Sequence, residues 1–294
     1  MPGTPGHSAT PRGIVNAMTV DVEEYFQVSA FANRISRDDW ETLPSRVEGS
    51  VGLLLDLFQR HDAKCTFFTL GWIAERHGPL IRRLVEAGHE LASHGYEHRR
   101  ATDQTADQFR ADVRRTKALL EDAGGVPVVG YRAASFSFDH RTPWAHQVLA
   151  EEGYRYSSSI YPVVHDHYGV PDAPRIPYRP AAADGVVEFP MSTLRLFGRN
   201  LPCSGGGYFR LFPYALSRWA IRRINTVDRQ PTIFYCHPWE VDPGQPRTDQ
   251  IDAKVRFRHY VNLDHMEAKL GRLLGDFAWD RVDKVFGKAN GIDC

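Results

Sequence analysis

Residues 61–98 read HDAKCTFFTLGWIAERHGPLIRRLVEAGHELASHGYEH, and this stretch decides the fold of the chain. Its β-branched and aromatic run at 64–70 predicts a strand, and the run PLIRRLVEA at 79–87 predicts a helix that ends at a glycine. Residues 90–93 predict a second, short strand that leads directly into His94. A strand, a helix and a strand at this spacing predict a parallel βαβ unit.

The same alternation extends along the rest of the chain. Further strands are predicted at 13–22, 126–131, 186–189 and 232–236, and further helices at 45–60, 105–123, 143–152 and 265–277. Repeated βα units predict an α/β fold with a parallel sheet, either a barrel or a doubly wound sheet. Ligand sites in both architectures lie at the carboxyl ends of the strands.

The segment 163–214 differs from its surroundings. It is rich in proline, glycine and arginine, and apart from the strand at 186–189 it has no long periodic pattern. Such a segment is either a large set of active-site loops or a mobile lid.

Composition excludes several classes of protein. Lysine plus arginine equals aspartate plus glutamate, 36 each, so no net field recruits nucleic acid or an anionic membrane. The four cysteines show no paired spacing, so we expect no disulfide framework and expect Cys65 and Cys236 to be buried thiols. Residues 1–13 predict a flexible tail without a signal peptide, and no apolar run is long enough to cross a bilayer, so a cytoplasmic protein is expected.

Three polar segments follow predicted strands and could form one site. They are TVDVEE at 19–24, SHGYEH at 93–98 and FYCHPW at 234–239. Two imidazoles and a carboxylate make a facial site for a divalent cation and leave positions open for water and substrate. A further carboxylate and a further histidine then remain to move protons, which distinguishes a reaction centre from a structural metal site.

Residues 61–98 resemble the second motif of the polysaccharide deacetylases, the NodB-homology group of carbohydrate esterase family 4. Other segments resemble the subfamily found with exosortase (PEP-CTERM) exopolysaccharide loci: VDVEEYFQVSAF, GYRAASFSF, EEGYRYSSSIYPVVHDHYG, GGGYFR, FYCHPWEVDP and RFRHYVNL. The resemblance implies one catalytic domain over 14–280, a distorted (β/α)7 barrel in which 163–214 is a loop-rich insertion, followed by a C-terminal tail at 281–294. It also implies removal of N-acetyl groups from amino sugars of a polysaccharide, in exopolysaccharide biosynthesis or modification.

The resemblance also implies roles for the polar segments. His94 and His98 would bind a divalent metal, which we expect to be Zn²⁺. Most family members carry adjacent aspartates as base and ligand, whereas this chain has Asp21 and Glu23 two positions apart. Strand alternation places these two on one face, so Asp21 is expected as the general base and Glu23 as the metal ligand. A competing register, with Glu23 as base and Glu24 as ligand, stays open.

The remaining catalytic roles fall on Arg132 and His237. Arg132 matches the family arginine that orients the base, and His237 matches the general acid. Three aromatic residues are expected to contact the sugar, namely Tyr131, Tyr208 and Trp239. Backbone N–H groups of the turn at 131–134 are expected to hold the oxyanion. The loops at 165–168 and 205–210 either contact sugar or only hold the insertion together, and His89 is expected to be structural.

Two other classes of function remain open at this stage. The Asp-x-Glu pattern resembles the allantoinase branch, which suggests a hydrolase of small cyclic amides. A polysaccharide-binding module with a decayed site is the second alternative, although retention of the polar residues together argues against decay. The expected partner is an N-acetylated polysaccharide or oligosaccharide, met in the cytoplasm near the inner membrane, and the oligomeric state is left open.

Overall fold

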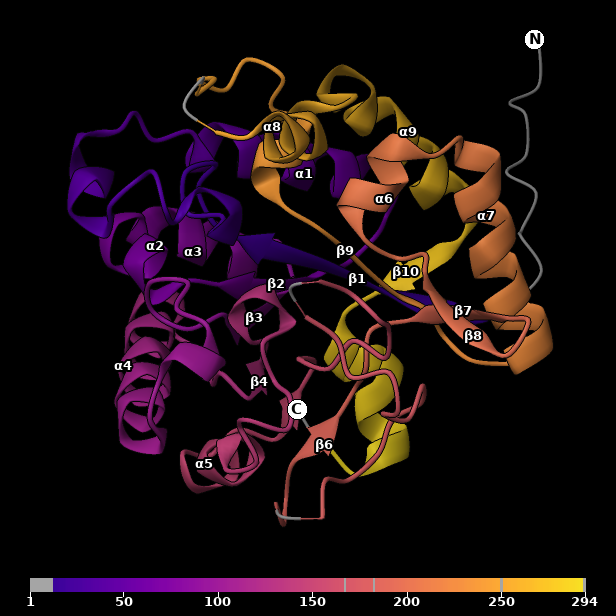
Figure 1. The fold of residues 1–294 in the computed structure, drawn as a ribbon, viewed down its shortest axis with the longest axis horizontal. Helices are drawn as coiled ribbons and strands as arrows, with labels where there is room; N and C mark the ends of the chain where they lie inside the picture. Colours follow the sequence, from indigo (N-terminus) through magenta and orange to yellow (C-terminus); the bar gives the residue numbers. More distant parts are fainter. Residues whose placement is uncertain (1–12, 167, 182, 249–250, 293–294) are drawn as a thin grey trace, which may run out of the picture.

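The computed structural model describes residues 13–166, 168–181, 183–248 and 251–292, so most of the predicted tail at 1–13 lies outside the described residues. At its centre is a parallel sheet in the order β10-β1-β2-β3-β4-β5-β6, with β9 also paired to β1 (Figure 1). The strands are β1 (Val15–Val22), β2 (Thr66–Thr69), β3 (Glu90–Ser93), β4 (Gly130–Tyr131), β5 (Tyr156–Ser157), β6 (Val187–Glu188), β9 (Ile233–Cys236) and β10 (Ala278–Asp280). The predicted α/β fold is confirmed, and the sheet curls into a half-barrel.

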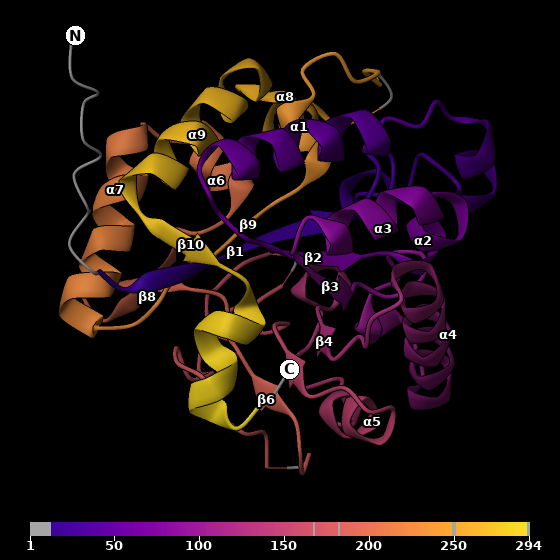
Figure 2. The same ribbon diagram turned by 180° about the vertical axis from the view of Figure 1, so that it is seen from behind.

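Helices surround this sheet (Figures 1 and 2). They are α1 (Val47–Arg60), α2 (Gly71–Arg76), α3 (Gly78–Glu86), α4 (Ala106–Gly124), α5 (Ala145–Glu151), α6 (Gly206–Leu211), α7 (Tyr214–Arg223), α8 (Ala253–Tyr260) and α9 (Met266–Asp276). The long helix α4 begins with a capping box between Thr105 and Gln108, and it ends at Gly125, whose φ of 67° suits glycine. Within the described part of the chain, no helix is long and apolar enough to cross a membrane.

Strand β1 shows how the sequence positions the site. Met18, Val20 and Val22 point into the main apolar core, which the inner face of α1 also lines. Thr19 and Asp21 alternate with them and therefore face the other side of the sheet. That alternation delivers a carboxylate to the interior of the half-barrel at the carboxyl end of the strand.

Two predicted segments differ from the structure. The insertion at 163–214 contains an antiparallel hairpin of β7 (Thr193–Leu196) and β8 (Arg199–Pro202), followed by α6. The expected tail at 281–294 is packed as far as it is described, because Val282, Phe286 and Ile292 are buried in a second core cluster. The strands and helices in these two segments are too short to show helical or strand periodicity in the sequence.

Candidate functional site

The carboxylate of Asp21 is held by a buried arginine. Arg132, directly after β4, places Nη1 2.7 Å from Asp21 Oδ1 and 2.8 Å from Thr19 Oγ1. Its Nε donates to the Ser158 carbonyl at 3.2 Å, and its guanidinium lies 4.1 Å from the centre of the Phe68 ring. Arg132 is fully buried and Asp21 is 3% exposed. A hydrogen-bonded pair of this kind holds the carboxylate in one orientation.

Beside this pair, Glu23, His94 and His98 bring their ligand atoms within 4.8 Å of one another. All three side chains are buried. Glu23 Oε2 lies 3.0 Å from His98 Nε2, and no other described residue donates a hydrogen bond to that oxygen. A buried carboxylate oxygen that converges with two imidazoles is a set of ligands that fits a divalent cation. These residues come from different strand ends, so the folded sheet creates the cluster.

The two histidines are oriented for this role by different partners. His94 Nδ1 donates to the Arg132 carbonyl at 2.9 Å, which leaves its Nε2 to face the cluster. Burial lowers the pKa of His94 to about 4, so its imidazole is neutral and can act as a ligand. His98 adopts a φ of 52°, uncommon for a residue other than glycine, and its Nδ1 lies 3.5 Å from Ser29 Oγ. Ser29 in turn bonds to Ser135 at 2.6 Å.

The surroundings of Glu23 favour the ionised form of its carboxyl group. Burial alone would raise its pKa, but the neighbouring His98, His237 and His94 outweigh burial and lower the pKa of Glu23 to about 2. The indole N–H of Trp239 donates to Glu23 Oε1 at 3.2 Å. Trp239 therefore positions the carboxylate, which the sequence did not predict.

Glu24 is placed away from this cluster, which does not fit the competing register. Its carboxylate accepts hydrogen bonds from the hydroxyl of Ser45 and from the backbone N–H groups of Arg46 and Val47, the latter two at 3.0 and 3.1 Å. Glu24 thus caps the N-terminus of α1, where a helix offers unpaired donors. Alternation after Asp21 and Glu23 explains why the next carboxylate points to the opposite side, where α1 covers it.

His237 follows β9 and lies beside the cluster of Glu23, His94 and His98. Its Nε2 lies 3.7 Å from Glu23 Oε1, and its Nδ1 lies 3.4 Å from Glu240 Oε2. Burial lowers the pKa of His237, but the bond with Glu240 and the charges of Glu23, Glu240 and Asp21 outweigh burial and raise that pKa to about 9. His237 is therefore an imidazolium at neutral pH, a group that can donate a proton.

A second set of residues holds His237, and sequence reasoning missed it. Glu240 Oε2 accepts the backbone N–H of His237 at 3.0 Å, while Glu240 Oε1 accepts from Arg210 Nε at 3.0 Å. Arg210 is almost fully buried and donates to the carbonyls of His259 and Val261 at 2.8 and 2.7 Å. A glutamate three positions after a histidine, in HPWE, and the arginine of GGGYFR were the available signals.

Helix α6 can approach Glu240 only because Gly206 has no side chain. A Cβ at Gly206 would lie 1.9 Å from Glu240 Oε2, a distance that no real side chain could keep. The glycine-rich run before Tyr208 thus serves close packing around Glu240.

Two expected sugar contacts are corrected by the structure. Tyr131 is buried among Phe109, Phe138 and Tyr154, because it alternates with Arg132 and points to the opposite face. Trp239 is 8% exposed, since its ring is stacked between His237 and His259, with centroids 5.0 and 4.2 Å away. Neither side chain offers an open face to a ligand.

The other expected contacts with substrate were the backbone N–H groups of the turn at 131–134 and the ring of Tyr208. The N–H groups of Arg132 and Ala133 already donate to the Ser93 carbonyl and to Ser159 Oγ, both at 2.9 Å, so neither is free for an oxyanion. Tyr208 is half-buried on α6 and stacks on Phe212, and its contact with sugar stays a prediction.

Two histidines outside the cluster also have local partners. His89 Nδ1 accepts the N–H of Cys65 at 3.1 Å, a structural role as expected. In the loop at 165–168, His165 stacks on Tyr168 with centroids 3.9 Å apart, and residue 167 lies outside the described residues.

Comparison with known proteins finds a family model that covers part of this site. Residues 40–157 match the family model for polysaccharide deacetylases, and residues 158–287 match that of a domain of unknown function, DUF3473. The deacetylase match covers less than half of the chain, so the likeness to that family is shown for residues 40–157. The deacetylase match contains His94, His98 and Arg132, whereas His237 and Glu240 lie in the DUF3473 region.

Relatives with assigned names match over short segments. A peptidoglycan deacetylase of Helicobacter pylori is 31% identical over 114 residues, which are 38% of this chain and 38% of that protein. A peptidoglycan-N-acetylglucosamine deacetylase of Listeria monocytogenes is 33% identical over 75 residues, 25% of this chain and 16% of that protein. The chain therefore spans well under two thirds of the relatives that it matches.

Two solved structures share the fold over nearly the whole chain. A Mycobacterium smegmatis protein described as a polysaccharide deacetylase has a TM-score of 0.58 at 20% identity, covering 99% of this chain and 96% of its own. Puue allantoinase has a TM-score of 0.57 at 16% identity, covering 96% and 92%. At such identities the likeness shows the fold alone.

Proposed function

We propose that this chain belongs to the polysaccharide deacetylase family and is a metal-dependent hydrolase that removes N-acetyl groups from the amino sugars of a polysaccharide or oligosaccharide. One observation carries the proposal: a buried Glu23–His94–His98 cluster lies beside an arginine-held carboxylate and a protonated histidine. The first group could hold a cation, the second could accept a proton and the third could donate one.

Within this proposal, Glu23, His94 and His98 hold the cation, for which we propose Zn²⁺. When bound, it would supply Lewis acidity toward the amide carbonyl and the attacking water. Asp21 accepts a proton from that water as its oxygen attacks the acetyl carbon. Arg132 bonds to the Asp21 carboxylate and prevents its rotation.

His237 acts at the other end of the scissile bond. An amine leaves poorly as an anion, so the nitrogen must gain a proton as the C–N bond breaks. The Nε2 of His237 faces the cluster and can supply that proton, while Glu240 holds the ring from behind. The products are acetate and a free amino sugar.

The proposal is tested by the release of acetate. Purified protein loaded with Zn²⁺ is incubated with chitin oligomers and with peptidoglycan fragments, since two similar proteins are named peptidoglycan deacetylases. Acetate that appears with wild type and is lost in Asp21→Asn supports the function. Hydrolysis of allantoin without acetate release would support the cyclic-amide alternative instead, and a metal-loaded protein that hydrolyses neither would be a binding module.

We also propose a polymer and a place of action for this activity. Action on an exopolysaccharide from an exosortase-type locus, and a cytoplasmic site of action near the inner membrane, come from the resemblance of motifs such as EEGYRYSSSIYPVVHDHYG. Isolating the acetylated polymer of the same cells and showing that the protein deacetylates it would establish that pathway.

A further inference from the structure

One stretch of the chain is rich in arginine and contains no acidic residue of its own. Residues 189–227 contain six arginines and neither aspartate nor glutamate, although the whole chain balances 36 basic against 36 acidic residues. This stretch forms the β7–β8 hairpin, α6 and α7. Arg210 is buried with Glu240, but the other arginines of the stretch reach the surface. The balance of the whole chain therefore hides a local cationic surface.

The outer face of α7 is apolar where a surface helix is normally polar. Its inner face is buried through Tyr214, Ser217, Ala220 and Ile221. On the outer face, Leu216 and Trp219 are each 44% exposed, and Val227 in the following turn is 57% exposed. Leu216, Trp219, Arg223 and Val227 recur at intervals of three and four residues, so they share one side of the helix. Exposed apolar groups gathered in this way mark an interaction surface.

The β7–β8 hairpin adds an apolar tip beside this helix. Phe197, at the turn, is completely exposed. Arg175 ties the two elements together, because it bonds to Thr193 Oγ1 at 3.0 Å in β7 and to Asp228 Oδ2 at 2.7 Å just after α7. Figures 1 and 2 both show the hairpin turn beside the C-terminal end of α7.

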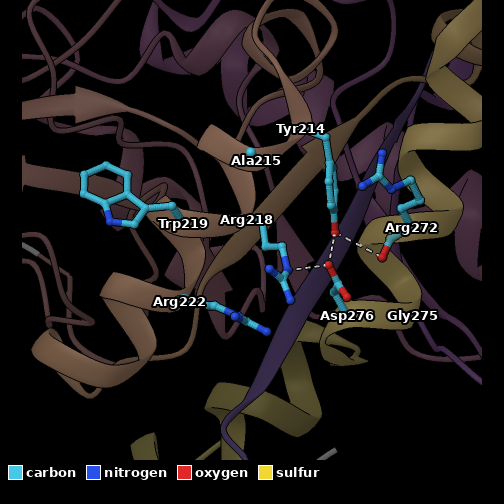
Figure 3. A pocket seen from close by; sticks show the side chains of 8 residues that line it. All are labelled: Tyr214, Ala215, Arg218, Trp219, Arg222, Arg272, Gly275 and Asp276. Atoms are coloured by element: carbon cyan, nitrogen blue, oxygen red, sulfur yellow. Dashed lines mark hydrogen bonds and ion pairs between the residues drawn. The ribbon is translucent and has the colours of Figure 1, made fainter.

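A groove with a cationic rim runs between α7 and α9 (Figure 3). Its volume is about 740 Å³, and Trp219 and Arg222 line it. Arg218 is neutralised there by Asp276 at 2.7 Å. Among the described residues, Arg222 and Arg223 have no carboxylate partner, so their guanidinium groups are available to an anion.

We propose that Phe197, Leu216, Trp219, Arg222, Arg223 and Val227, here called the α7 surface, dock the protein on an anionic phospholipid bilayer. Exposed aromatic and aliphatic side chains enter the interfacial region of a bilayer, and tryptophan favours the headgroup level. Arginine pairs with headgroup phosphates in a bidentate way. A symmetric contact with a second copy would set these arginines against one another with no acidic residue in the stretch to neutralise them, so lipid is the better occupant.

Sedimentation with vesicles tests this inference. The full chain is mixed with phosphatidylcholine vesicles that contain or lack phosphatidylglycerol, and the partition coefficient is measured at low and high salt. Binding is expected only with phosphatidylglycerol and should weaken with salt. Arg222→Gln and Arg223→Gln should each lower the partition coefficient about fivefold, and Leu216→Ser should lower it by a similar factor of about five.

Matched control variants come from elsewhere on the chain. Leu53 on α1 is 43% exposed, almost the same as Leu216, and Arg82 on α3 is exposed. Leu53→Ser and Arg82→Gln should leave partitioning unchanged. No variant should change acetate release from soluble oligomers, so a failure here is separate from a failure of the proposed deacetylase function.

Three results would overturn the inference. The first is equal partitioning of Leu216→Ser and wild type. The second is an absence of binding to phosphatidylglycerol vesicles. The third is a concentration-dependent dimer, seen by light scattering, that Leu216→Ser dissolves, since the surface would then contact a second copy.

Discussion

Glu240 offers the sharpest test of how the site is held. We expect Glu240→Gln to lower turnover of acetamido sugars, because the carboxylate bonds to His237 Nδ1 and helps to raise its pKa to about 9. Without that charge the pKa of His237 falls, and each unit of the fall removes about tenfold of the protonated form at alkaline pH. At pH 8 a fall of about one to two units in that pKa lowers the protonated fraction, and with it kcat for amide substrates, by about 2- to 10-fold.

The sign of the pH dependence is fixed by the role of His237. The imidazolium is the active form, so amide hydrolysis declines as pH rises through the pKa of His237. In Glu240→Gln that decline should begin at lower pH than in wild type. Hydrolysis of 4-nitrophenyl acetate should change little, because its leaving group needs no proton. The ratio of amide to ester turnover is therefore the quantity to measure.

A matched variant separates this effect from a loss of stability. Glu188 is also a buried glutamate paired with a histidine, 2.9 Å from His146 Nε2, and it accepts the N–H groups of Ser159 and Ile160. Removing a buried carboxylate leaves its hydrogen-bond donors unpaired, at a cost of about 1–3 kcal/mol, so both variants should unfold more easily. Only Glu240→Gln should alter the amide-to-ester ratio. An equal fall on both substrates in Glu240→Gln would refute the reasoning.

Three further predictions concern the acidic residues. Asp21→Asn should retain bound Zn²⁺, measured by atomic absorption after dialysis, and lose about 10²- to 10⁴-fold in kcat. Glu23→Gln should weaken Zn²⁺ binding itself. Glu24→Gln should keep the metal and lower the melting temperature, because Glu24 caps α1. Loss of metal in Glu24→Gln alone would make Glu24, and not Glu23, the acidic ligand. Burial and the neighbouring Asp283 raise the pKa of Glu90 to about 8, so the folded state holds a proton that the unfolded chain releases near pH 4.5. The melting temperature should therefore fall as pH rises from about 5 to about 8, and Glu90→Gln should flatten that dependence in calorimetry.

The sequence predicted those features that periodicity and alternation encode. The strand before Asp21, the helix at 105–123 and the strand before His237 all form close to their predicted bounds. Alternation along β1 also placed Asp21 and Glu23 toward one side. The same rule, applied to Tyr131 beside Arg132, would have excluded Tyr131 from the site.

What the sequence could not predict depends on contacts between distant segments. Arg210 and Glu240 meet only because α6 packs on the turn after β9, and a lone arginine in a glycine-rich run has no periodic signal. Trp239 was expected to contact the sugar because aromatic residues beside a site often do. In the structure His237 covers one face of its ring and His259, from α8, covers the other. The role of Glu24 likewise became visible only when the N-terminus of α1 was in place.

Strand β1 has three neighbours, and two of them come from the far end of the chain. It pairs with β2, with β9 through Ala17–Val20 and with β10 through Val15–Ala17, and Thr19 Oγ1 also donates to the Phe234 carbonyl at 2.8 Å. The two family models meet near residue 158. Because strands from both sides of that position pair in one sheet, we do not expect it to be a boundary between two domains that fold separately. Cutting the chain there should yield two insoluble fragments, and activity should return only when both are refolded together.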